Sequence, residues 1–503
     1  MAYPELIFSQ MNQNFYMGTF LYNVMIRGYA YNGPYQKCMY MFDEMSQRGL
    51  RPNNFTYPYV LNVLGEIGGY KEGKSVHCQI VKLGFECVRS VLESVLSFYL
   101  RDFSDDVKGF RNEMLDDARK IFDCLGNRPV ELWNRMIYEY GKIGAVGGAR
   151  EMFDEMPQRD VVSWNSMISC YGRAGDLDTA RWLFEKMPEK NVVSWTTMVG
   201  AYASTGDLDT ARKLFDEMPE KNVVSWNSMI SGYTRQGKFQ EALDLFSCMH
   251  SEGVGYDGFT LASALTACAH QGALEFGKWI HFYLIKDWFE LGVIVGTALI
   301  EMYAKCGDVD RALKVFIKLG QKDVFCWNVM IMSLASHGRV GDAVKSFYLM
   351  KKLGLRPNEY TFTSVLFACS HGGLIEEGRR IFYSMEKEYG INPTVKHYGC
   401  LIDLFGRNGQ LEEAHLVLKE MPFEPDIAIW GALLGGCRAA NDFKLAEMVI
   451  DKIVELKTNE PGVHVIVSNI YASIGQWPEA ARARERMEEN KMLKNAGCSS
   501  VVV

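Results

Sequence analysis

Several features that mark common classes of protein are missing from this sequence. No stretch approaches the roughly 18 consecutive apolar residues that a membrane-spanning helix needs, so we expect no membrane partner. The thirteen cysteines are scattered singly without a CxxC pair, which disfavours a zinc ribbon or redox motif and is typical of a reducing compartment. The 54 Lys and Arg against 61 Asp and Glu give a net charge of −7, not the positive excess of a general nucleic-acid binder.

Two further absences concern targeting and catalysis. No lysine or arginine precedes Arg27 and no Ser/Arg-rich segment is visible, so the sequence shows no transit peptide. His250-Ser251-Glu252 is the single HxE triplet, and no PCxxC follows it before Val503, so the signature of zinc-dependent base deaminases is absent. We therefore expect no catalytic residue, metal site or cofactor, and a protein that is not an enzyme.

One string matches the pattern of a nucleotide-binding loop. GGYKEGKS (68–75) satisfies GxxxxGK[ST], in which backbone amides and a lysine hold phosphates. Related strings, GALEFGKW (272–279) and GGLIEEGRR (372–380), recur after similar lead-ins but lack the final Ser or Thr. Because a phosphate loop has no reason to recur in decaying copies, we interpret all three as one structural repeat. Its glycines, Gly73, Gly277 and Gly378, would let two helices cross closely.

Repetition is the dominant feature of the chain. At 503 residues it is too long for one ordinary core, and 48% hydrophobic residues exclude general disorder. Segments 161–191 and 192–222 are near-copies of 31 residues, and each contains two apolar stripes at helical spacing. Gly175 is placed to end the first helix and Asp176 to cap the second. Each unit is therefore predicted to be a helical hairpin that must stack on its neighbours, in an all-α solenoid.

The same register runs along almost the whole chain. Twelve repeats, 31 to 36 residues long apart from 89–129, are predicted over 19–426, after a partial repeat in 1–18 and before degenerate repeat-like motifs in 427–503. A polar bulge at 102–112 accounts for the longer repeat. The predicted starts are Thr19, Asn54, Arg89, Val130, Val161, Val192, Val223, Gly258, Val293, Val324, Glu359 and Val395.

Two polar columns run through the repeats. Position 5 is small and polar in Asn23, Asn134, Asn165, Thr196, Asn227, Thr297 and Asn328, and the last position is Asn or Asp in Asn53, Asp160, Asn191, Asn222, Asp257, Asp323 and Asn358. Such side chains are suited to reading hydrogen-bonding edges. A helix N-cap role alone would explain the last position but not position 5. A period near 34 also fits tetratricopeptide repeats, which bind peptides, so a protein-binding scaffold remains an alternative.

At this point the chain resembles the plant pentatricopeptide repeat (PPR) family, PLS class, E subgroup. The motifs that carry the resemblance are VVSWNSMI, GDLDTARKLFDEMPEKN, TALIEMYAKCGD, GLRPNEYTFTSVLFACSHGGLIEEG and CLIDLFGRNGQLEEA, and they extend over essentially all 503 residues. The resemblance implies a right-handed superhelix whose groove binds single-stranded RNA, one base per repeat. It implies that position 5 and the last position read the base, and that position 2 packs against it. Position 2 is Phe20, Val162, Val193, Val224, Ile294 or Phe325, whereas Glu131 departs from the pattern.

The tail sharpens the functional expectation. Residues 427–503 resemble the paired E motifs of RNA-editing specificity factors, without the DYW deaminase domain. The resemblance implies a monomeric adaptor for C-to-U editing of organellar RNA, with a DYW-type cytidine deaminase and organellar editing-factor proteins as partners in trans. The mitochondrion is the expected compartment and the chloroplast the alternative. A role in stabilisation, splicing or translation of a transcript is the other outcome compatible with RNA binding.

By resemblance, Asn with Asp reads U, Asn with Asn reads C, Thr with Asn reads A, and Thr with Asp reads G. Applied along the array, these pairs give 5′-C-N-N-U-C-A-U-N-G-C-N-N-3′, with the edited C about four nucleotides beyond the last repeat's base. The unassigned bases fall on the repeats at 54, 89, 258, 359 and 395.

Overall fold

The computed structural model describes residues 18–101, 111–126, 128–286, 292–440 and 442–455, several residues between 465 and 472, and 477–489. The described residues are helical apart from their connections and contain no strand. They divide into two compact units, residues 1–232 and 233–503, which we describe separately. The predicted partial repeat in 1–18 and most of the bulge at 102–112 lie outside the described residues.

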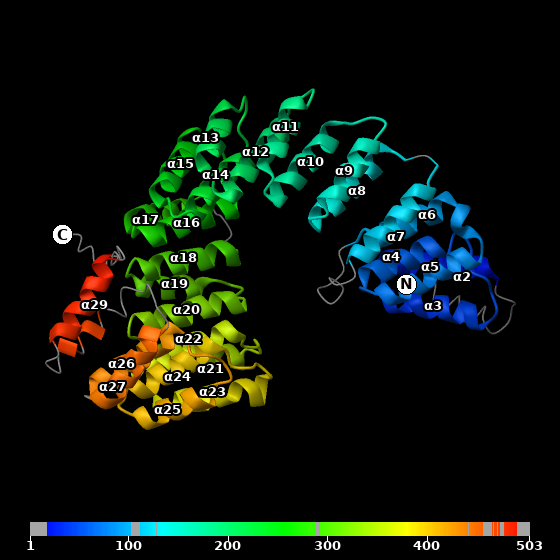
Figure 1. The fold of residues 1–503 in the computed structure, drawn as a ribbon. Helices are drawn as coiled ribbons and strands as arrows, with labels where there is room; N and C mark the ends of the chain where they lie inside the picture. Colours follow the sequence, from blue (N-terminus) through cyan, green and yellow to red (C-terminus); the bar gives the residue numbers. More distant parts are fainter. Residues whose placement is uncertain are drawn as a thin grey trace. The chain divides into compact units, whose positions relative to one another are not determined.

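Unit 1 is built from helices that pair as hairpins (Figure 1). They are α2 (Thr19–Asn32), α3 (Tyr35–Gln47), α4 (Tyr57–Glu66), α5 (Tyr70–Lys82), α6 (Arg89–Tyr99), α7 (Arg111–Cys124), α8 (Val130–Lys142), α9 (Val146–Glu155), α10 (Val161–Ala174), α11 (Leu177–Lys186), α12 (Val192–Thr205) and α13 (Leu208–Glu217), with a short 3₁₀ helix at Phe85–Cys87. Helix α14 (Val223–Arg235) spans the division between the units.

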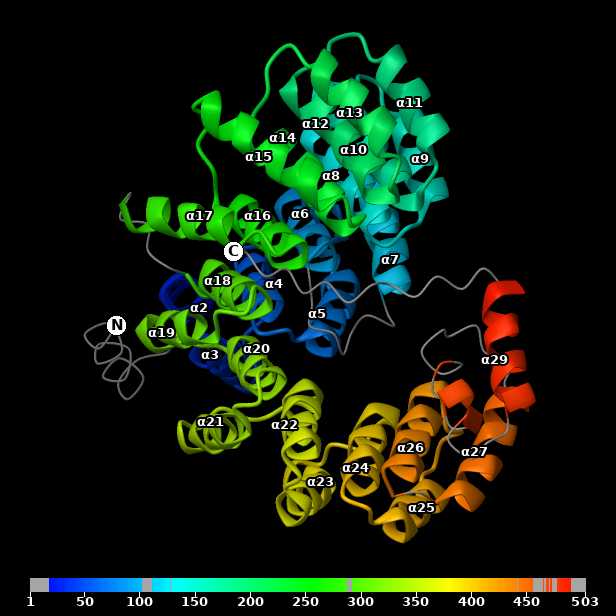
Figure 2. The same ribbon diagram turned by 90° about the vertical axis from the view of Figure 1, so that its left-hand side faces the viewer.

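Unit 2 repeats the pattern. It contains α15 (Phe239–Ser251), α16 (Gly258–Gln271), α17 (Leu274–Lys286), α18 (Val293–Lys305), α19 (Val309–Lys318), α20 (Val324–Ser336), α21 (Val340–Lys352), α22 (Glu359–Gly372), α23 (Ile375–Tyr389), α24 (Val395–Arg407), α25 (Leu411–Glu420), α26 (Ile427–Ala440), α27 (Phe443–Glu455) and α29 (Trp477–Glu489). Figure 2 shows α22, α24 and α26 side by side, each with its second helix beside it. First helices thus contact first helices, in the two-layer arrangement of an α-solenoid.

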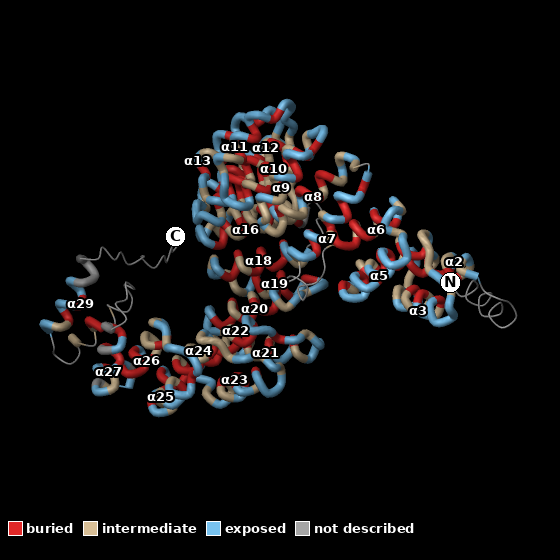
Figure 3. Tube along the Cα trace, turned by 45° about the vertical axis from the view of Figure 1, so that its right-hand side comes forward, coloured by how far each residue is buried: buried red, intermediate tan, exposed pale blue. Residues whose placement is uncertain are grey.

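The hairpin at α10 and α11 shows why the sequence folds in this way. Gly175 adopts φ 81°, the left-handed conformation that ends a helix, and Asp176 accepts a hydrogen bond of 3.0 Å from the backbone N–H of Thr179. The apolar stripe of α11, including Leu183 and Phe184, is buried. Figure 3 shows the same distribution along the trace, with buried segments where helices meet and exposed connections. The predicted helix stop and cap are confirmed.

An aromatic pair joins several repeats to the next. Phe153 of α9 meets Trp164 of α10 edge to face, at 5.1 Å and 80°, and the guanidinium of Arg159 lies 4.8 Å from the Phe153 centroid. Both contacts are attractive, because the positive edge or cation faces the negative ring face. The same three-part joint recurs at Phe122–Trp133 with Arg128, Phe184–Trp195 with Lys190, Phe215–Trp226 with Lys221 and Phe316–Trp327 with Lys322.

The predicted repeat starts coincide with the first residue of a helix at every position except Asn54. There the helix begins three residues later, at Tyr57. In a helix that began at Asn54, the carbonyl of Asn54 would accept a hydrogen bond from the backbone N–H of residue 58. Residue 58 is a proline and has no such N–H.

The GGYKEGKS string lies on a repeat helix, as predicted. Lys74 is within α5, with its Nζ 3.8 Å from carboxylate oxygens of Glu113 and Asp117. A Cβ on Gly73 would lie 2.0 Å from the ring of Phe98 in α6. The equivalent contacts are 2.4 Å from Gly277 to Met302 and 2.4 Å from Gly378 to Leu404. These glycines let helices cross closely, so the string is a packing feature.

Within the described residues, no helix combines the length and apolar composition that crossing a bilayer requires. The same residues bring no three His, Cys, Asp or Glu side chains together as a metal ion would require. Among the described cysteines, Cys78, Cys87, Cys124 and Cys248 are exposed, and six others are buried. Each of these four stands on a second helix or on the connection after it.

Candidate nucleic-acid interface

The two polar columns meet in space. Asn134, at position 5 of one repeat, donates from Nδ2 to Oδ1 of Asp160, its last residue, at 3.0 Å. The same Oδ1 caps α10 by accepting the backbone N–H of Ser163 at 2.8 Å. Burial opposes ionisation of Asp160, but the bonds from Ser163 and Asn134 outweigh it and hold its pKa below the usual value. The last residue is therefore an N-cap and a partner of position 5 at once.

Other pairs share this geometry to different degrees. The amide of Asn23 donates to Asn53 at 3.0 Å, and that of Asn328 donates to Asn358 at 3.1 Å. The Thr196 hydroxyl lies 3.5 Å from Oδ1 of Asn222 and donates more closely, at 2.7 Å, to the carbonyl of Val192.

In two further pairs the last residue caps a helix and the position-5 residue is buried. Asn191 and Asp323 cap their helices, whereas the paired position-5 residues, Asn165 and Thr297, are buried. Asn227 and Asp257 belong to different units, and within unit 2 Asp257 caps α16.

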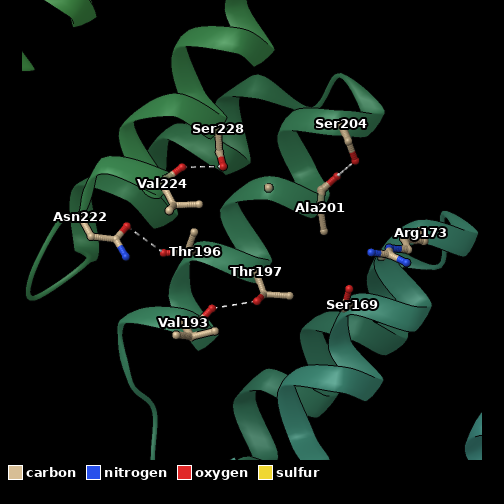
Figure 4. A pocket seen from close by; sticks show the side chains of 12 residues that line it. Ser169, Arg173, Val193, Thr196, Thr197, Ala201, Ser204, Asn222, Val224 and Ser228 are labelled. Carbon is tan, nitrogen blue, oxygen red and sulfur yellow. Dashed lines mark hydrogen bonds between the residues drawn. The ribbon is translucent and has the colours of Figure 1, made fainter. Parts of the chain in front are cut away.

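A cavity of about 570 Å³ opens beside the Thr196/Asn222 pair (Figure 4). Val193 and Val224, the position-2 residues of two successive repeats, line it together with the pair. Ser169 and Arg173 of α10 complete its far side in the figure. The cavity thus has apolar walls, a polar edge and one cation.

A second cavity, of about 630 Å³, repeats this arrangement in unit 2. Its position-2 walls are Phe325 and Tyr360, and its polar edge is Asn328. Lys305 and His337 also line it. Recurrence of one arrangement at two places, built from the same repeat positions, is what a one-unit-per-repeat ligand requires.

The predicted position-2 residues are all exposed, from 54% for Val162 and Val193 to 80% for Phe20. Three further position-2 side chains were missed by the sequence analysis and are also exposed: Phe55, Phe259 and Tyr360. Exposed apolar groups in register are unusual on a soluble surface, and they offer faces for stacking.

A second missed feature is a basic residue at position 13, near the end of the first helix in eight of the twelve repeats. Arg173 and Lys305 both line cavities from this position. Arg173 lies 5.8 Å from the ring centroid of Tyr138, and Lys305 pairs with Glu301 at 2.7 Å. The basic side chains at this position are Arg101, Lys142, Arg173, Arg235, Lys305 and Arg407, with His270 and His371 in two further repeats. The net charge of −7 gives no sign of this column, because acidic residues elsewhere outnumber its basic residues. Its recurrence at the same position of successive repeats is the signal that could have identified it.

Comparison with family models identifies the repeats. Matches described as "PPR repeat family" cover residues 17–66, 221–270 and 322–371, and matches described as "PPR repeat" cover 131–161, 162–192, 193–223, 297–324, 360–389 and 389–422. A match described as "E motif" covers residues 440–502.

Relatives and solved structures agree. Pentatricopeptide repeat-containing protein At5g48910 of Arabidopsis thaliana is 33% identical over 506 residues, covering 99% of this chain and 68% of that protein. At5g56310 of the same plant is 33% identical over 488 residues, covering 96% and 79%. The match to At5g66520, at 45% identity over 245 residues, spans only 40% of that protein's length.

The crystal structure of maize PPR10 with an 18-nt psaJ RNA element has TM-score 0.64 at 19% identity, covering 97% of this chain and 82% of PPR10, and supports the solenoid fold. The chain therefore belongs to the pentatricopeptide repeat family, with an E motif after its repeats.

Proposed function

We propose that this protein binds single-stranded RNA in a sequence-specific manner, one base per repeat. The observation that carries the proposal is the recurring cavity: two position-2 side chains form its walls, and a position-5 residue lies at its polar edge. In the first cavity the last residue, Asn222, also lines this edge. A base stacks between apolar faces and is identified by hydrogen bonds at its edge. Similarity to PPR10, whose title names a bound RNA element, is consistent with this use of the fold.

The proposed biological role is that of an adaptor that specifies C-to-U editing sites in organellar RNA. The E motif after the repeats supports this role, with the deaminase supplied in trans by a DYW-type partner. One relative, At5g59200, is named chloroplastic and is 40% identical over 252 residues, 46% of its length. It favours an organelle without distinguishing the chloroplast from the mitochondrion, our first expectation.

The decisive experiment has two arms. Gel-shift titration with 5′-C-N-N-U-C-A-U-N-G-C-N-N-3′ should show saturable binding, and binding of no RNA would favour the peptide-binding scaffold. Deep sequencing of organellar RNA from a knockout line should then show one lost edit at a C downstream of this element. Loss of the transcript itself, with editing elsewhere unchanged, would favour a stabilisation or processing role.

A further inference from the structure

A hydroxyl residue accompanies six of the seven readout pairs, and Cys326 stands in its place after Asp323. The hydroxyl residue stands three places after the last-position residue, at position 3 of the following repeat, and its hydroxyl completes the helix cap. Ser163 accepts from the backbone N–H of Asp160 at 3.2 Å, and Thr361 accepts from that of Asn358 at 3.1 Å. The hydroxyl residues in this place are fully buried: Thr56, Ser163, Ser194, Ser225, Thr260 and Thr361.

At two threonines the hydroxyl also reaches the position-5 residue. Thr361 lies 2.6 Å from Oδ1 of Asn328, closer than its 3.0 Å to Oδ1 of Asn358. Thr56 lies 2.6 Å from Oδ1 of Asn23, again its shortest contact. A hydroxyl has one proton to donate, and the shorter contact takes it. The carbonyl oxygens of Asn328 and Asn23 each accept this hydrogen bond, which holds the side-chain amide in one orientation.

At two serines the position-5 carbonyl is left open. Ser163 directs its hydroxyl to Asp160 at 2.8 Å, and Ser194 directs its hydroxyl to Asn191 at 3.1 Å. Within the described residues, Oδ1 of Asn134 and Oδ1 of Asn165 are buried and have no hydrogen-bond partner. An unsatisfied buried acceptor is costly, so a rotation of the amide that brings the carbonyl to an N–H group is favoured.

We propose that this hydroxyl residue is a positioning residue that decides which atom of the position-5 asparagine faces the base; the inference rests on the proposed function. Atom N3 accepts a hydrogen bond in cytosine and carries a proton in uracil. An asparagine whose carbonyl is held by the hydroxyl keeps its second N–H for the base and selects C. An asparagine whose carbonyl is not held can rotate its amide and present the carbonyl to N3–H of U.

The three Asn/Asn pairs are therefore not equivalent. We expect Asn23/Asn53 and Asn328/Asn358 to select C alone, because a threonine hydroxyl holds the carbonyl of the position-5 asparagine. Asn165/Asn191 admits U as well as C. Asn134, whose amide is bound to Asp160 while its carbonyl is free, suits U, the base expected for that pair.

The test compares RNAs that carry C or U opposite one pair. Wild type should prefer C at least about tenfold opposite Asn328, since an edge contact discriminates by about 1–3 kcal/mol. Thr361→Val keeps the shape and removes the hydroxyl, so the C:U ratio there should fall to roughly that measured opposite Asn165, near one. Ser194→Ala is the matched control: it removes the same capping hydroxyl, and the ratio opposite Asn165 should not change.

A purely structural role for the hydroxyl gives a different result. Both variants would then lower stability or overall affinity, with C:U ratios as in wild type, and the proposal would be wrong. Thr56→Val provides the same test opposite Asn23 if circular dichroism shows that Thr361→Val does not fold. If wild-type protein binds neither RNA, the proposed function itself fails, and this inference fails with it.

Discussion

The repeats at 161–191 and 258–292 share one fold but present different groups at the candidate interface. The first places Asn165 at position 5 and Asn191 at its end, where Asn191 caps the next helix. The second has Ala262 and Gly292 in these places, and Gly292 caps nothing with a side chain. In our proposal the first repeat reads a base, and the second serves only to extend the stack.

Repeats without a reading pair still keep the residues that pack one repeat against the next. Repeats 54–88 and 258–292 both place a histidine of the second helix against a tyrosine of the next repeat: His77 with Tyr99 at 3.0 Å, and His281 with Tyr303 at 2.8 Å. Both also carry a glycine at which two helices cross closely, Gly73 in the first and Gly277 in the second. Stacking and reading therefore depend on separate residues, and each can be changed without the other.

The largest effect should come from the bases opposite reading repeats. Replacing U-C-A opposite the repeats at 130, 161 and 192 by A-A-C should weaken binding at least about a hundredfold, because each good base contact contributes about 1–3 kcal/mol of discrimination. Changing the three unassigned bases opposite the repeats at 54, 89 and 258 should change affinity by less than about threefold. Filter binding would check both, and equal losses would remove the distinction between the two kinds of repeat.

Substituting a residue that packs one repeat on the next should change the free energy of unfolding. Gly73→Ala places a Cβ 2.0 Å from the Phe98 ring, and overpacking should cost about 1–3 kcal/mol, less up to about 1 kcal/mol gained in helix propensity. Gly435→Ala, in α26 with open space around it, is the control and should stabilise slightly. Urea unfolding measures both free energies. A Gly73→Ala variant that is stabilised as much as Gly435→Ala would show that close crossing is not required there.

The His–Tyr contacts should make stability depend on pH. Burial lowers the pKa of His77 and the pKa of His281 in the folded protein, so the unfolded chain binds protons more readily. Stability should therefore fall as pH drops below the unfolded value of about 6.5 towards the folded pKa.

The double variant His77→Phe/His281→Phe should flatten this dependence. Phe382 already stands at the equivalent place in the repeat 359–394. Urea unfolding midpoints at pH 7.5 and pH 5.5, measured for both proteins, would show this change. Burial also lowers the pKa of His397, so some pH dependence of stability should remain in the variant. An unchanged slope in the variant would assign the pH dependence to other groups.

The smallest effect concerns the cations at position 13. Arg173→Gln should weaken binding of all RNAs alike and reduce the salt slope by about one, as expected for one phosphate contact. Arg181→Gln, which removes a cation paired with Glu185 on α11, is the control and should leave the slope unchanged. We expect the wild-type slope to be shallower than that of a binder making about 6–10 phosphate contacts. A drop confined to one RNA sequence would instead make Arg173 a base reader.

Much of this structure could be predicted because the sequence repeats itself. Gly175, Asp176 and the close-crossing Gly73 follow from local rules for helix ends and crossings, and repetition fixes their register. The late helix start at Tyr57 is the exception. It arises because Pro58 has no backbone N–H to donate to the carbonyl of Asn54. The contact of Thr361 with Asn328 could not be predicted, because it joins residues 33 apart through one side-chain rotamer.

The most direct test of base reading uses Thr196, which lines the cavity in Figure 4 beside its partner Asn222. Affinities of wild type and Thr196→Asn are measured for two RNAs that differ only by A or C opposite this repeat. We predict that wild type prefers A and that the variant shifts the ratio towards C by about tenfold or more, with preferences at other positions unchanged. The same ratio in both proteins would show that residue 196 does not read a base and that the proposed register is wrong.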